Sequence, residues 1–192
     1  MLAVLVPAAG ASSRMGARDK LLEPVAGQPL LRLMVARALS VTPHVAVTLR
    51  APDPERRAVL AGLDVVVIPV PDAATGMAAS LRVGADWALS GRCSALMVVL
   101  PDMPDITTED LHTLVADYAH HPDTPLRAAS HDGQPGNPVI LPRALWPLLS
   151  GLSGDQGARA IFATHPPRLC ALQGDRALTD LDTPEAWARW RK

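Results

Sequence analysis

Short apolar runs rich in branched side chains recur along this chain, and segments with helical character separate them. Four of these runs are expected to form strands, at Leu2–Val6, Val45–Leu49, Val65–Pro69 and Ala95–Leu100. Nearly continuous apolar strands are typical of a parallel sheet that is covered on both faces. Strands that alternate with helices favour a doubly wound α/β fold over a sandwich or a bundle. The sequence therefore predicts a mostly parallel sheet in a single domain that spans residues 1–192.

The segments between these runs carry the signals of helix starts. Proline stands in the first turn of the expected helices at residues 29–39 and 184–191, where its missing N–H costs little. The expected helix at residues 107–118 opens with Thr-Thr-Glu-Asp, which is a capping pattern. Further helices are expected at residues 53–61, 75–89 and 156–164.

The second half of the chain is less regular. Shorter strands are expected at residues 128–130, 139–141 and 168–172. The segment His131–Pro138 contains two prolines and two glycines, so we expect an irregular loop there. The sequence contains no internal repeat, low-complexity segment or linker that would divide it into parts.

The composition excludes several classes of protein. The chain has 18 basic and 19 acidic residues and a formal net charge of −1, so no charge excess marks a surface for duplex nucleic acid. Apolar residues make up 48%, which disfavours a disordered chain. No apolar run reaches the ~18 residues of a membrane helix. Aromatic residues make up only 3%, which disfavours a stacking platform for single strands. We therefore expect neither nucleic acid nor a membrane as a partner.

The cysteines and the first residues bear on the cellular compartment. Cys93 and Cys170 are the only cysteines, and neither belongs to a CxxC motif or lies at metal-ligand spacing from a histidine. Two reduced thiols in a cytoplasmic protein are therefore expected. The apolar start of the chain lacks the basic segment of a signal peptide, so Leu2–Val6 is expected to be a buried strand.

The loop after the first expected strand has the residue types of an anion site. Ala8, Ala9 and Gly10 are small, which lets backbone N–H groups approach phosphate oxygens closely. Arg14 and Lys20 follow, and both can neutralise phosphate charge, the arginine through a bidentate fork. The spacing matches neither the GxxxxGKS/T nor the GxGxxG fingerprint. From the residues alone, a surface turn with solvated cations is an equally good interpretation.

Carboxylates follow two other segments. Asp102 comes directly after the run Ala95–Leu100 and one proline. Ligand sites in open α/β sheets lie beyond the carboxyl ends of strands, and Mg²⁺ binds through one or two carboxylates together with phosphates and water. Asp180 and Asp182 share one face of an extended segment, and they offer a partner for Asp102. The alternatives are a turn residue at Asp102, a helix cap at Asp182 and a solvated edge residue at Asp180.

Six motifs in consistent order, over nearly the whole chain, resemble the molybdenum cofactor nucleotidyltransferases. In sequence letters they are AAGxSSRMGxxDKLL from Ala8, GMxxSLRxG from Gly76, LPDMP from Leu100, PGNP from Pro135, GDxGAR from Gly154 and LDTPE from Leu181. The Ala-Ala-Gly opening is most similar to the cytidylyltransferase branch, because the guanylyltransferase branch usually has a second glycine there.

The resemblance implies a Rossmann-like sheet of the nucleotide-diphospho-sugar transferase type and a Mg²⁺-dependent transfer. A CMP or GMP moiety would pass from the nucleoside triphosphate, with CTP expected here, to the terminal phosphate of molybdopterin, and pyrophosphate would leave. It implies catalytic roles for Arg14, Lys20 and Asp102 and Mg²⁺ ligation by Asp102 and Asp182. The implied nucleotide-binding residues are Ala8, Ala9, Gly10, Ser12, Ser13, Arg14, Lys20, Gly76, Ser80 and Asp102. The implied acceptor-binding residues are Gly136, Asn137, Asp155 and Arg159.

The sequence departs from the family pattern at three places. Pro7 stands where leucine is more usual, and Asn137 stands where the cytidylyltransferases commonly have histidine. Met77-Ala78-Ala79 conforms only loosely. An ordinary helix cap at Asp155 and a solvated side chain at Arg159 remain alternatives to acceptor binding.

Two other functions fit parts of the pattern. The near alternative is the same chemistry with GTP or on a sugar or polyol phosphate. The alternative of another class is a non-catalytic chaperone that delivers the cofactor to a partner molybdoenzyme. Arg14, Lys20, Asp102 and Asp182 are all present, which argues for catalysis because a protein that only binds need not keep the four together.

Overall fold

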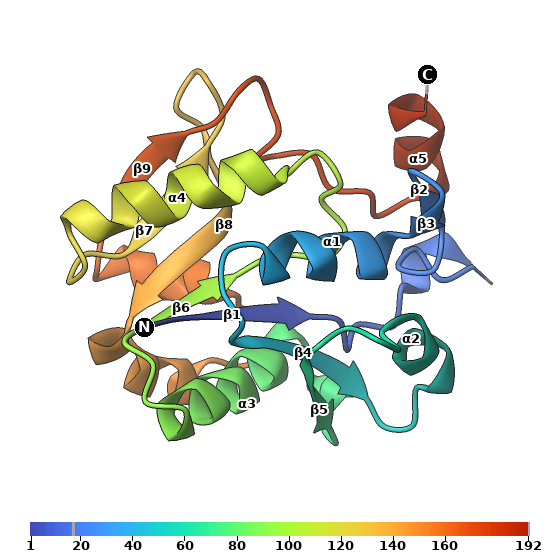
Figure 1. The fold of residues 1–192 in the computed structure, drawn as a ribbon, viewed down its shortest axis with the longest axis horizontal. Helices are drawn as coiled ribbons and strands as arrows, with labels where there is room; N and C mark the ends of the chain where they lie inside the picture. The colour runs from blue at the N-terminus through green and yellow to red at the C-terminus, as the bar shows by residue number, and fades with distance from the viewer. Residues whose placement is uncertain (17, 192) are drawn as a thin grey trace.

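The fold is centred on one seven-stranded sheet. The structure is a computed structural model that describes residues 1–16 and 18–191. Its strand order is β5-β4-β1-β6-β8-β7-β9 (Figure 1). The strands are β1 (Leu2–Pro7), β4 (Val45–Arg50), β5 (Val66–Val70), β6 (Ala95–Val98), β7 (Leu126–Ala129), β8 (Pro135–Pro142) and β9 (Arg168–Ala171). A separate ribbon pairs β2 (Pro24–Val25) with β3 (Gln28–Pro29).

The strand directions give the sheet its class. Strands β5, β4, β1 and β6 are parallel to one another, and β9 is parallel to β7. Strand β8 runs antiparallel to both of its neighbours, β6 and β7. The mostly parallel, doubly wound sheet predicted from the sequence is therefore confirmed.

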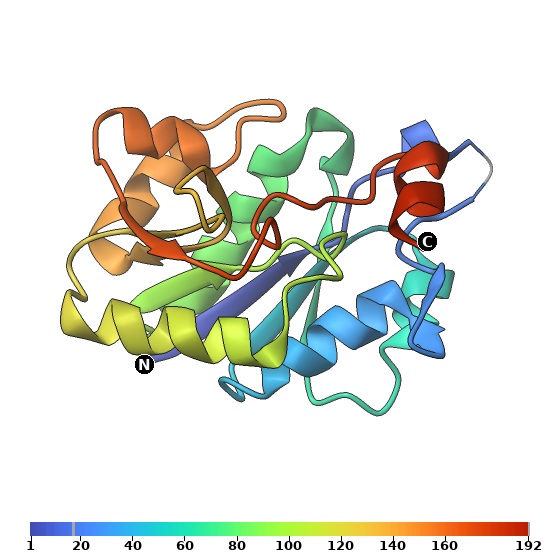
Figure 2. The same cartoon turned by 90° about the horizontal axis from the view of Figure 1, so that it is seen from above.

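Helices connect the strands and cover both faces of the sheet. The α-helices are α1 (Leu30–Leu39), α2 (Pro54–Val59), α3 (Met77–Ser90), α4 (Thr108–His120) and α5 (Pro184–Trp190). The 3-10 segments are η1 (Ser13–Met15), η2 (Ala73–Thr75), η3 (Arg143–Gly151) and η4 (Ala158–Ala163). The predicted capping pattern is confirmed at α4, where the side chain of Thr107 accepts from the N–H of Asp110 and the Asp110 carboxylate accepts from the N–H of Thr107. Helices α1 and α4 lie side by side on one face (Figure 2).

The alternation of side chains along β1 builds two cores. Val4 and Val6 point to the face covered by α1 and α4, where they pack in one cluster with Met34 of α1. Ala3 and Leu5 point to the opposite face, where α3, η3 and η4 pack. All the β1 residues from Ala3 to Val6 are fully buried, so both faces of this central strand contribute to the hydrophobic free energy of folding.

Gly84 sets how closely α3 approaches the sheet. A Cβ on this residue would lie 2.3 Å from Cδ2 of Leu5 and 2.7 Å from its Cδ1. The helix therefore rests directly on the central strand at this point. The glycine lowers the intrinsic stability of the helix, and this close packing is the physical reason for its presence.

The structure corrects the expectations for the second half of the chain. The segment expected as a loop up to Pro138 is already strand from Pro135 onward, so that part of the prediction was wrong. The register shift between β7 and β8 leaves residues 136–138 opposite Ala128 as a bulge, and a bulge accommodates Gly and Pro within a strand. The helix expected at 156–164 is the shorter 3-10 segment η4, and η3 lies where no element was expected.

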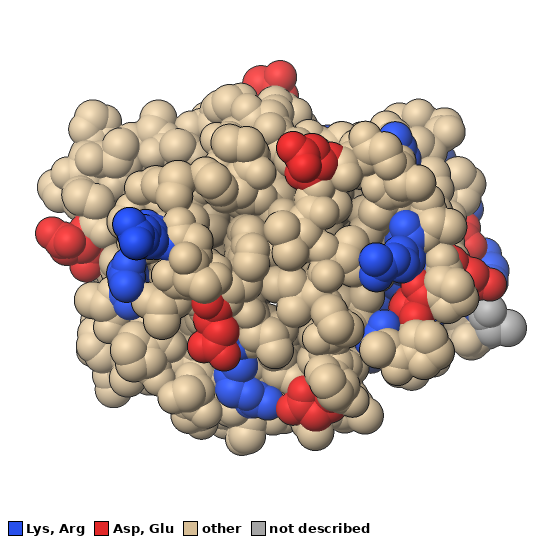
Figure 3. Space-filling model, turned by 60° about the horizontal axis from the view of Figure 1, so that its bottom comes forward, with Lys and Arg blue, Asp and Glu red and all other residues tan. Residues whose placement is uncertain are grey.

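Within residues 1–16 and 18–191, no helix has both the length and the apolar character needed to cross a membrane. On the face shown in Figure 3, charged side chains are sparse and the two signs are interspersed.

Candidate active site

A cleft of about 1030 Å³ opens beyond the carboxyl ends of β1 and β6. Ten of the residues predicted to bind nucleotide, acceptor or metal line it: Gly10, Ser12, Ser13, Arg14, Lys20, Asp102, Asn137, Asp155, Arg159 and Asp182. Asp180, the other carboxylate singled out in the sequence, lines it as well. They come from segments spread over the whole chain. The fold brings them together because the carboxyl ends of parallel strands share one edge of the sheet.

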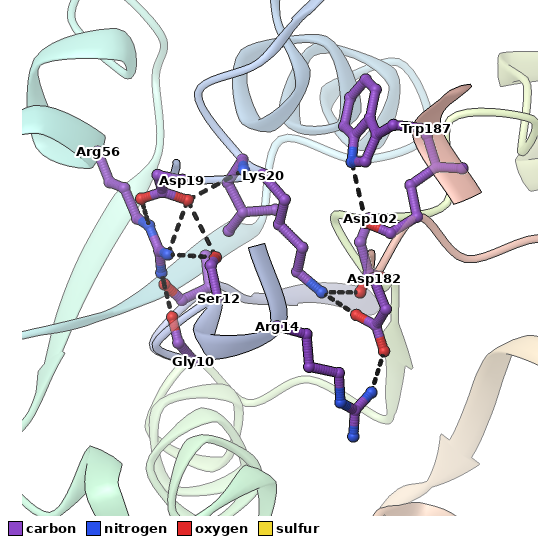
Figure 4. A network of polar contacts seen from close by, with 12 residues as sticks. Gly10, Ser12, Arg14, Asp19, Lys20, Arg56, Asp102, Asp182 and Trp187 are labelled. Carbon is purple, nitrogen blue, oxygen red and sulfur yellow. Dashed lines mark hydrogen bonds and ion pairs between the residues drawn. The ribbon is translucent and has the colours of Figure 1, made fainter. Parts of the chain in front are cut away.

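A buried arginine that the sequence analysis did not single out shapes the loop after β1. The side chain of Arg56 in α2 is fully buried. Its Nη1 donates hydrogen bonds to the carbonyl oxygens of Ala8 and Gly10, both at 2.6 Å, and its Nη2 donates to Oγ of Ser12 at 3.0 Å (Figure 4). Because these carbonyl oxygens accept from the guanidinium of Arg56, the loop from Ala8 to Ser12 is anchored to α2.

Asp19 completes this arrangement from the other end of the loop. Its carboxylate accepts from Nε of Arg56 at 2.7 Å, from Nη2 at 2.9 Å and from the N–H of Leu21 at 3.0 Å. Burial favours the protonated form, but the hydrogen bonds and the charge of Arg56, with those from Leu21 and Ser12, outweigh it and lower the pKa of Asp19. The carboxylate is therefore ionised, and the pair fixes both ends of the loop that leads to Lys20.

Lys20 joins the two carboxylates that were predicted to lie together. Its Nζ donates to Oδ2 of Asp102 at 2.5 Å and also to Oδ1 of Asp182. Arg14 donates from Nη1 to Oδ2 of Asp182 at 2.6 Å. The side chain of Arg14 is 71% exposed, so this pair contributes about 1 kcal/mol or less. Lys20 and Asp102 are each only 15% exposed, and their pairing is the stronger contact.

The pKa values of the side chains in this cluster depend on the charges of their neighbours in the cluster. Burial would lower the pKa of Lys20, but the charges and hydrogen bonds of Asp102 and Asp182 outweigh it and raise that pKa. Burial also opposes ionisation of Asp182, yet Lys20 and then Arg14 hold its pKa below the ordinary value of 3.8. Asp180 differs, because burial and the neighbouring charges of Asp182 and Asp102 raise its pKa.

The donor set of this cluster fits a divalent cation. Asp102 Oδ1 is buried and has no hydrogen-bond partner among the described residues, so one hard oxygen ligand is available. The two carboxylates already bind one cation, the ammonium of Lys20. The third carboxyl, Asp180, lines the same cleft and has a raised pKa that a nearby cation would lower. Carboxylate oxygens are the ligands that Mg²⁺ and Mn²⁺ prefer.

Backbone contacts hold the segment that carries Asp180 and Asp182 in place. The N–H of Leu181 donates to the carbonyl oxygen of Asp102 at 2.9 Å, and Nε1 of Trp187 donates to the carbonyl oxygen of Leu181 at 3.1 Å. Thr183 caps α5 by accepting from the N–H of Ala186. The cap is therefore Thr183 and not Asp182, which was the structural alternative for that carboxylate.

Five residues of the predicted site lie outside the residues that line the cleft. Ala8, Ala9 and Ser80 are buried, so their side chains are not presented to a ligand at the cleft surface. Gly76 has φ +101°, and a Cβ there would lie 2.4 Å from the carbonyl carbon and oxygen of Gly154. Gly136 is similar, because a Cβ would lie 1.9 Å from the carbonyl oxygen of Ala177. The structure thus gives both glycines a packing role at the walls of the site.

The cleft also contains residues that are not fixed positions of the motifs. They are Arg127, Gln156 and Phe162 and the apolar side chains Val98 and Val139. The motif residues Met77, Leu81 and Leu100, to which no site role was assigned, line it as well. A local signal exists for Arg127, which is a single charged residue within the apolar strand β7. No local signal marks Arg56, because its contacts in the loop lie 37 to 48 residues away along the chain.

Comparison with known proteins identifies the family. Residues 4–169 match the MobA-like NTP transferase domain. The chain belongs to this family. It is 30% identical to the molybdenum cofactor guanylyltransferase of Rhodobacter capsulatus, covering 97% of this chain and 88% of that protein. It is 28% identical to the purine catabolism protein PucB of Bacillus subtilis, covering 96% of this chain and 93% of that one.

Solved structures that are similar to this chain agree with its membership of this family. Rv0371c from Mycobacterium tuberculosis superposes with a TM-score of 0.83 at 26% identity, covering 98% of this chain and 96% of that one. A complex of Rv0371c with manganese superposes with a TM-score of 0.79 at 25% identity. This MobA-like chain is therefore a nucleotidyltransferase by family, with the α/β fold of the nucleotide-diphospho-sugar transferases.

Proposed function

We propose that this protein transfers CMP from CTP to the terminal phosphate of molybdopterin, with Mg²⁺ bound and pyrophosphate released. The observation that supports it best is the Lys20, Asp102 and Asp182 cluster, in which one buried oxygen of Asp102 is left available. The cluster faces the cleft together with Gly10, Ser12 and Arg14, on the loop after β1. Phosphoryl and nucleotidyl transfer depend mainly on positioning and on charge neutralisation, and this arrangement provides both.

Each charged side chain has a distinct role in this proposal. Mg²⁺, when bound by Asp102 and Asp182, supplies positive charge at the phosphate oxygens. Lys20 neutralises phosphate charge from a fixed position, because Asp102 and Asp182 orient its ammonium. Arg14 is exposed at the mouth of the cleft, where its guanidinium binds the phosphates that depart as pyrophosphate. The loop held by Arg56 supplies the backbone groups that bind the nucleotide.

The choice of CTP rests on the Ala8-Ala9-Gly10 opening, which resembles the cytidylyltransferase branch. The second candidate is a guanylyltransferase, and the similarity to the Rhodobacter capsulatus protein named as a molybdenum cofactor guanylyltransferase favours it. A further protein similar to this chain is named for purine catabolism. The acceptor molybdopterin and a molybdoenzyme that receives the product belong to the same proposal.

Pyrophosphate release distinguishes these candidates. We expect release with CTP and Mg²⁺ only when molybdopterin is present, and we expect little release with GTP. Asp102→Asn should lower turnover by a factor of about 10²–10³, the usual cost of losing an electrostatic group at the reacting phosphate. Turnover with GTP but not with CTP would make GTP the nucleotide of the proposed reaction. Pyrophosphate release that occurs only with a sugar phosphate would replace molybdopterin as the proposed acceptor. Unchanged turnover in Asp102→Asn would exclude the metal site.

A further inference from the structure

Two arginines stand in the cleft away from the cluster of Lys20 and Asp102. Arg127 belongs to β7, and Arg159 belongs to η4. Arg127 lies in register with Val139 of β8, which lies in register with Val98 of β6. Residues in register project from the same face of a sheet, and all of these residues line the cleft. Arg127 is therefore two strands from β6, roughly 10 Å across the sheet at the usual spacing of strands.

The guanidinium of Arg127 is fixed in orientation. Its Nε donates to the carbonyl oxygen of Gly136 at 2.7 Å, and its Nη2 donates to the carbonyl oxygen of Pro135 at 3.1 Å. The group also lies over the ring of Phe162, 5.7 Å from the ring centre. Within the described part of the chain, Nη1 has no hydrogen-bond partner. The side chain is therefore already oriented before a ligand binds, and Nη1 can still donate a hydrogen bond. This preorganisation lowers the entropic cost of binding a ligand.

The two arginines at this end of the cleft carry positive charge that no direct ion pair neutralises among the described residues. In the described ranges 1–16 and 18–191, neither Arg127 nor Arg159 forms an ion pair, although Asp155 lines the same cleft. Burial, and after it the charge of Arg159, lower the pKa of Arg127. Two neighbouring guanidinium groups without a counter-charge repel each other, and an anion between them removes that cost.

We propose that Arg127 and Arg159 form an oxyanion subsite for the acceptor substrate, separate from the position of its terminal phosphate, which attacks the α-phosphate of the nucleotide. This inference rests on the proposed nucleotidyl transfer, because it assigns the acceptor to the end of the cleft remote from Lys20. The floor between the two ends is apolar, formed by Val98 and Val139. An acceptor that fits this cleft has a phosphate at one end, an uncharged body over the two valines and an anionic oxygen group at the other end.

Inorganic phosphate is the probe for this subsite. It is titrated calorimetrically into the full-length protein, saturated with Mg²⁺ and the non-hydrolysable α,β-methylene analogue of CTP, and in a second series with that of GTP. With the nucleotide phosphates in place, the part of the remaining phosphate binding that an arginine variant removes reports the arginine pair. The variants are Arg159→Gln and Arg127→Gln, and the matched control is Arg57→Gln, an exposed arginine on α2. The thermal unfolding midpoint of each variant reports its folding.

Arg159→Gln is the primary variant, because Arg159 is exposed while Arg127 also holds the carbonyls of β8. We expect it to weaken phosphate binding by about tenfold, the loss of one charge-assisted hydrogen bond. The control should bind phosphate as the unmodified protein does. In turnover, the acceptor KM should rise while the nucleotide KM stays constant.

Two results would overturn the subsite. One is unchanged phosphate affinity in Arg159→Gln. The other is a weaker affinity for the nucleotide analogue, which would assign the arginines to the nucleotide phosphates. A loss of phosphate binding without any pyrophosphate release by the unmodified protein would count against the proposed transfer and in favour of the subsite, so the two failures can be told apart.

Discussion

Arg56 binds both carboxylate oxygens of Asp19, with Nε 2.7 Å from Oδ2 and Nη2 2.9 Å from Oδ1. The same guanidinium binds the carbonyl oxygens of Ala8 and Gly10. A buried arginine of α2 thus fixes the conformation of a loop that contacts the cleft through Gly10 and Ser12, although Arg56 itself does not line the cleft.

Removing this arginine should destabilise the protein strongly. Arg56→Met removes the positive charge that pairs with Asp19 and the donor to two carbonyl oxygens, and we expect a loss of about 3 kcal/mol in the free energy of unfolding. The double variant Arg56→Met, Asp19→Asn should lose less than the single variant, because no unpaired charge remains. Urea unfolding followed by circular dichroism measures both. Equal losses in the two variants would show that the carbonyl contacts carry the whole effect.

The same pair predicts a pH dependence of stability. The pKa of Asp19 is lowered in the folded protein from its ordinary value of 3.8, so the folded state binds this proton less readily than the unfolded state. The carboxylate therefore contributes stability above pH 3.8 that is lost as the pH falls through its lowered pKa. We expect unmodified protein to be more stable than Asp19→Asn at pH 7, and the difference to shrink below pH 4. A difference that is constant from pH 7 to pH 3 would contradict this.

Gly76 should tolerate no side chain. Gly76→Ala places a Cβ 2.4 Å from the backbone carbonyl of Gly154, at a φ of +101°. Neither the backbone contact nor the strain can be relieved by a rotamer change, so we expect a loss of about 2–4 kcal/mol and a displaced segment around Asp155. Gly151→Ala is the matched control, since it has open space around its Cβ. Thermal unfolding and turnover of the two variants should differ, and equal values would contradict the close approach.

Lys20 should compete with a divalent cation for the two carboxylates. Lys20→Met removes the ammonium between Asp102 and Asp182, so Mg²⁺ or Mn²⁺ alone should raise the unfolding midpoint of this variant more than that of the unmodified protein. Turnover should fall by a factor of about 10²–10³, because a group that neutralises phosphate charge is lost.

The double variant Lys20→Met, Asp102→Asn is the control for the metal effect. It should show no larger metal-dependent shift than the unmodified protein. If the shift in Lys20→Met persists after Asp102 is replaced, the metal binds elsewhere, for example at the exposed group His131, Asp132 and Asp175.

The proximity of Lys20 and Asp102 could be predicted from the sequence, because residues that follow parallel strands meet at one edge of the sheet. The place of Asp182 beside them followed from the resemblance to the family. The extent of β8 could not be predicted. Its glycine and prolines oppose strand locally, and pairing with β6 and β7 on both sides overrides that preference. Arg56 also could not be predicted, because an arginine in a short helix normally faces water. Only the long-range contact of α2 with the loop after β1 gives it buried partners.

The hydrogen bond from Leu181 to the carbonyl of Asp102 has a consequence for the order of events during synthesis. Lys20 is separated from Asp182 by 162 residues, so the loop after β1 leaves the ribosome long before its second carboxylate partner. Until the segment around Leu181 docks, Lys20 has Asp102 as its only carboxylate partner among those of the finished site. The nascent chain can therefore form most of its sheet before these charged groups are assembled, and the cluster is complete only when the connection between β9 and α5 docks against Asp102.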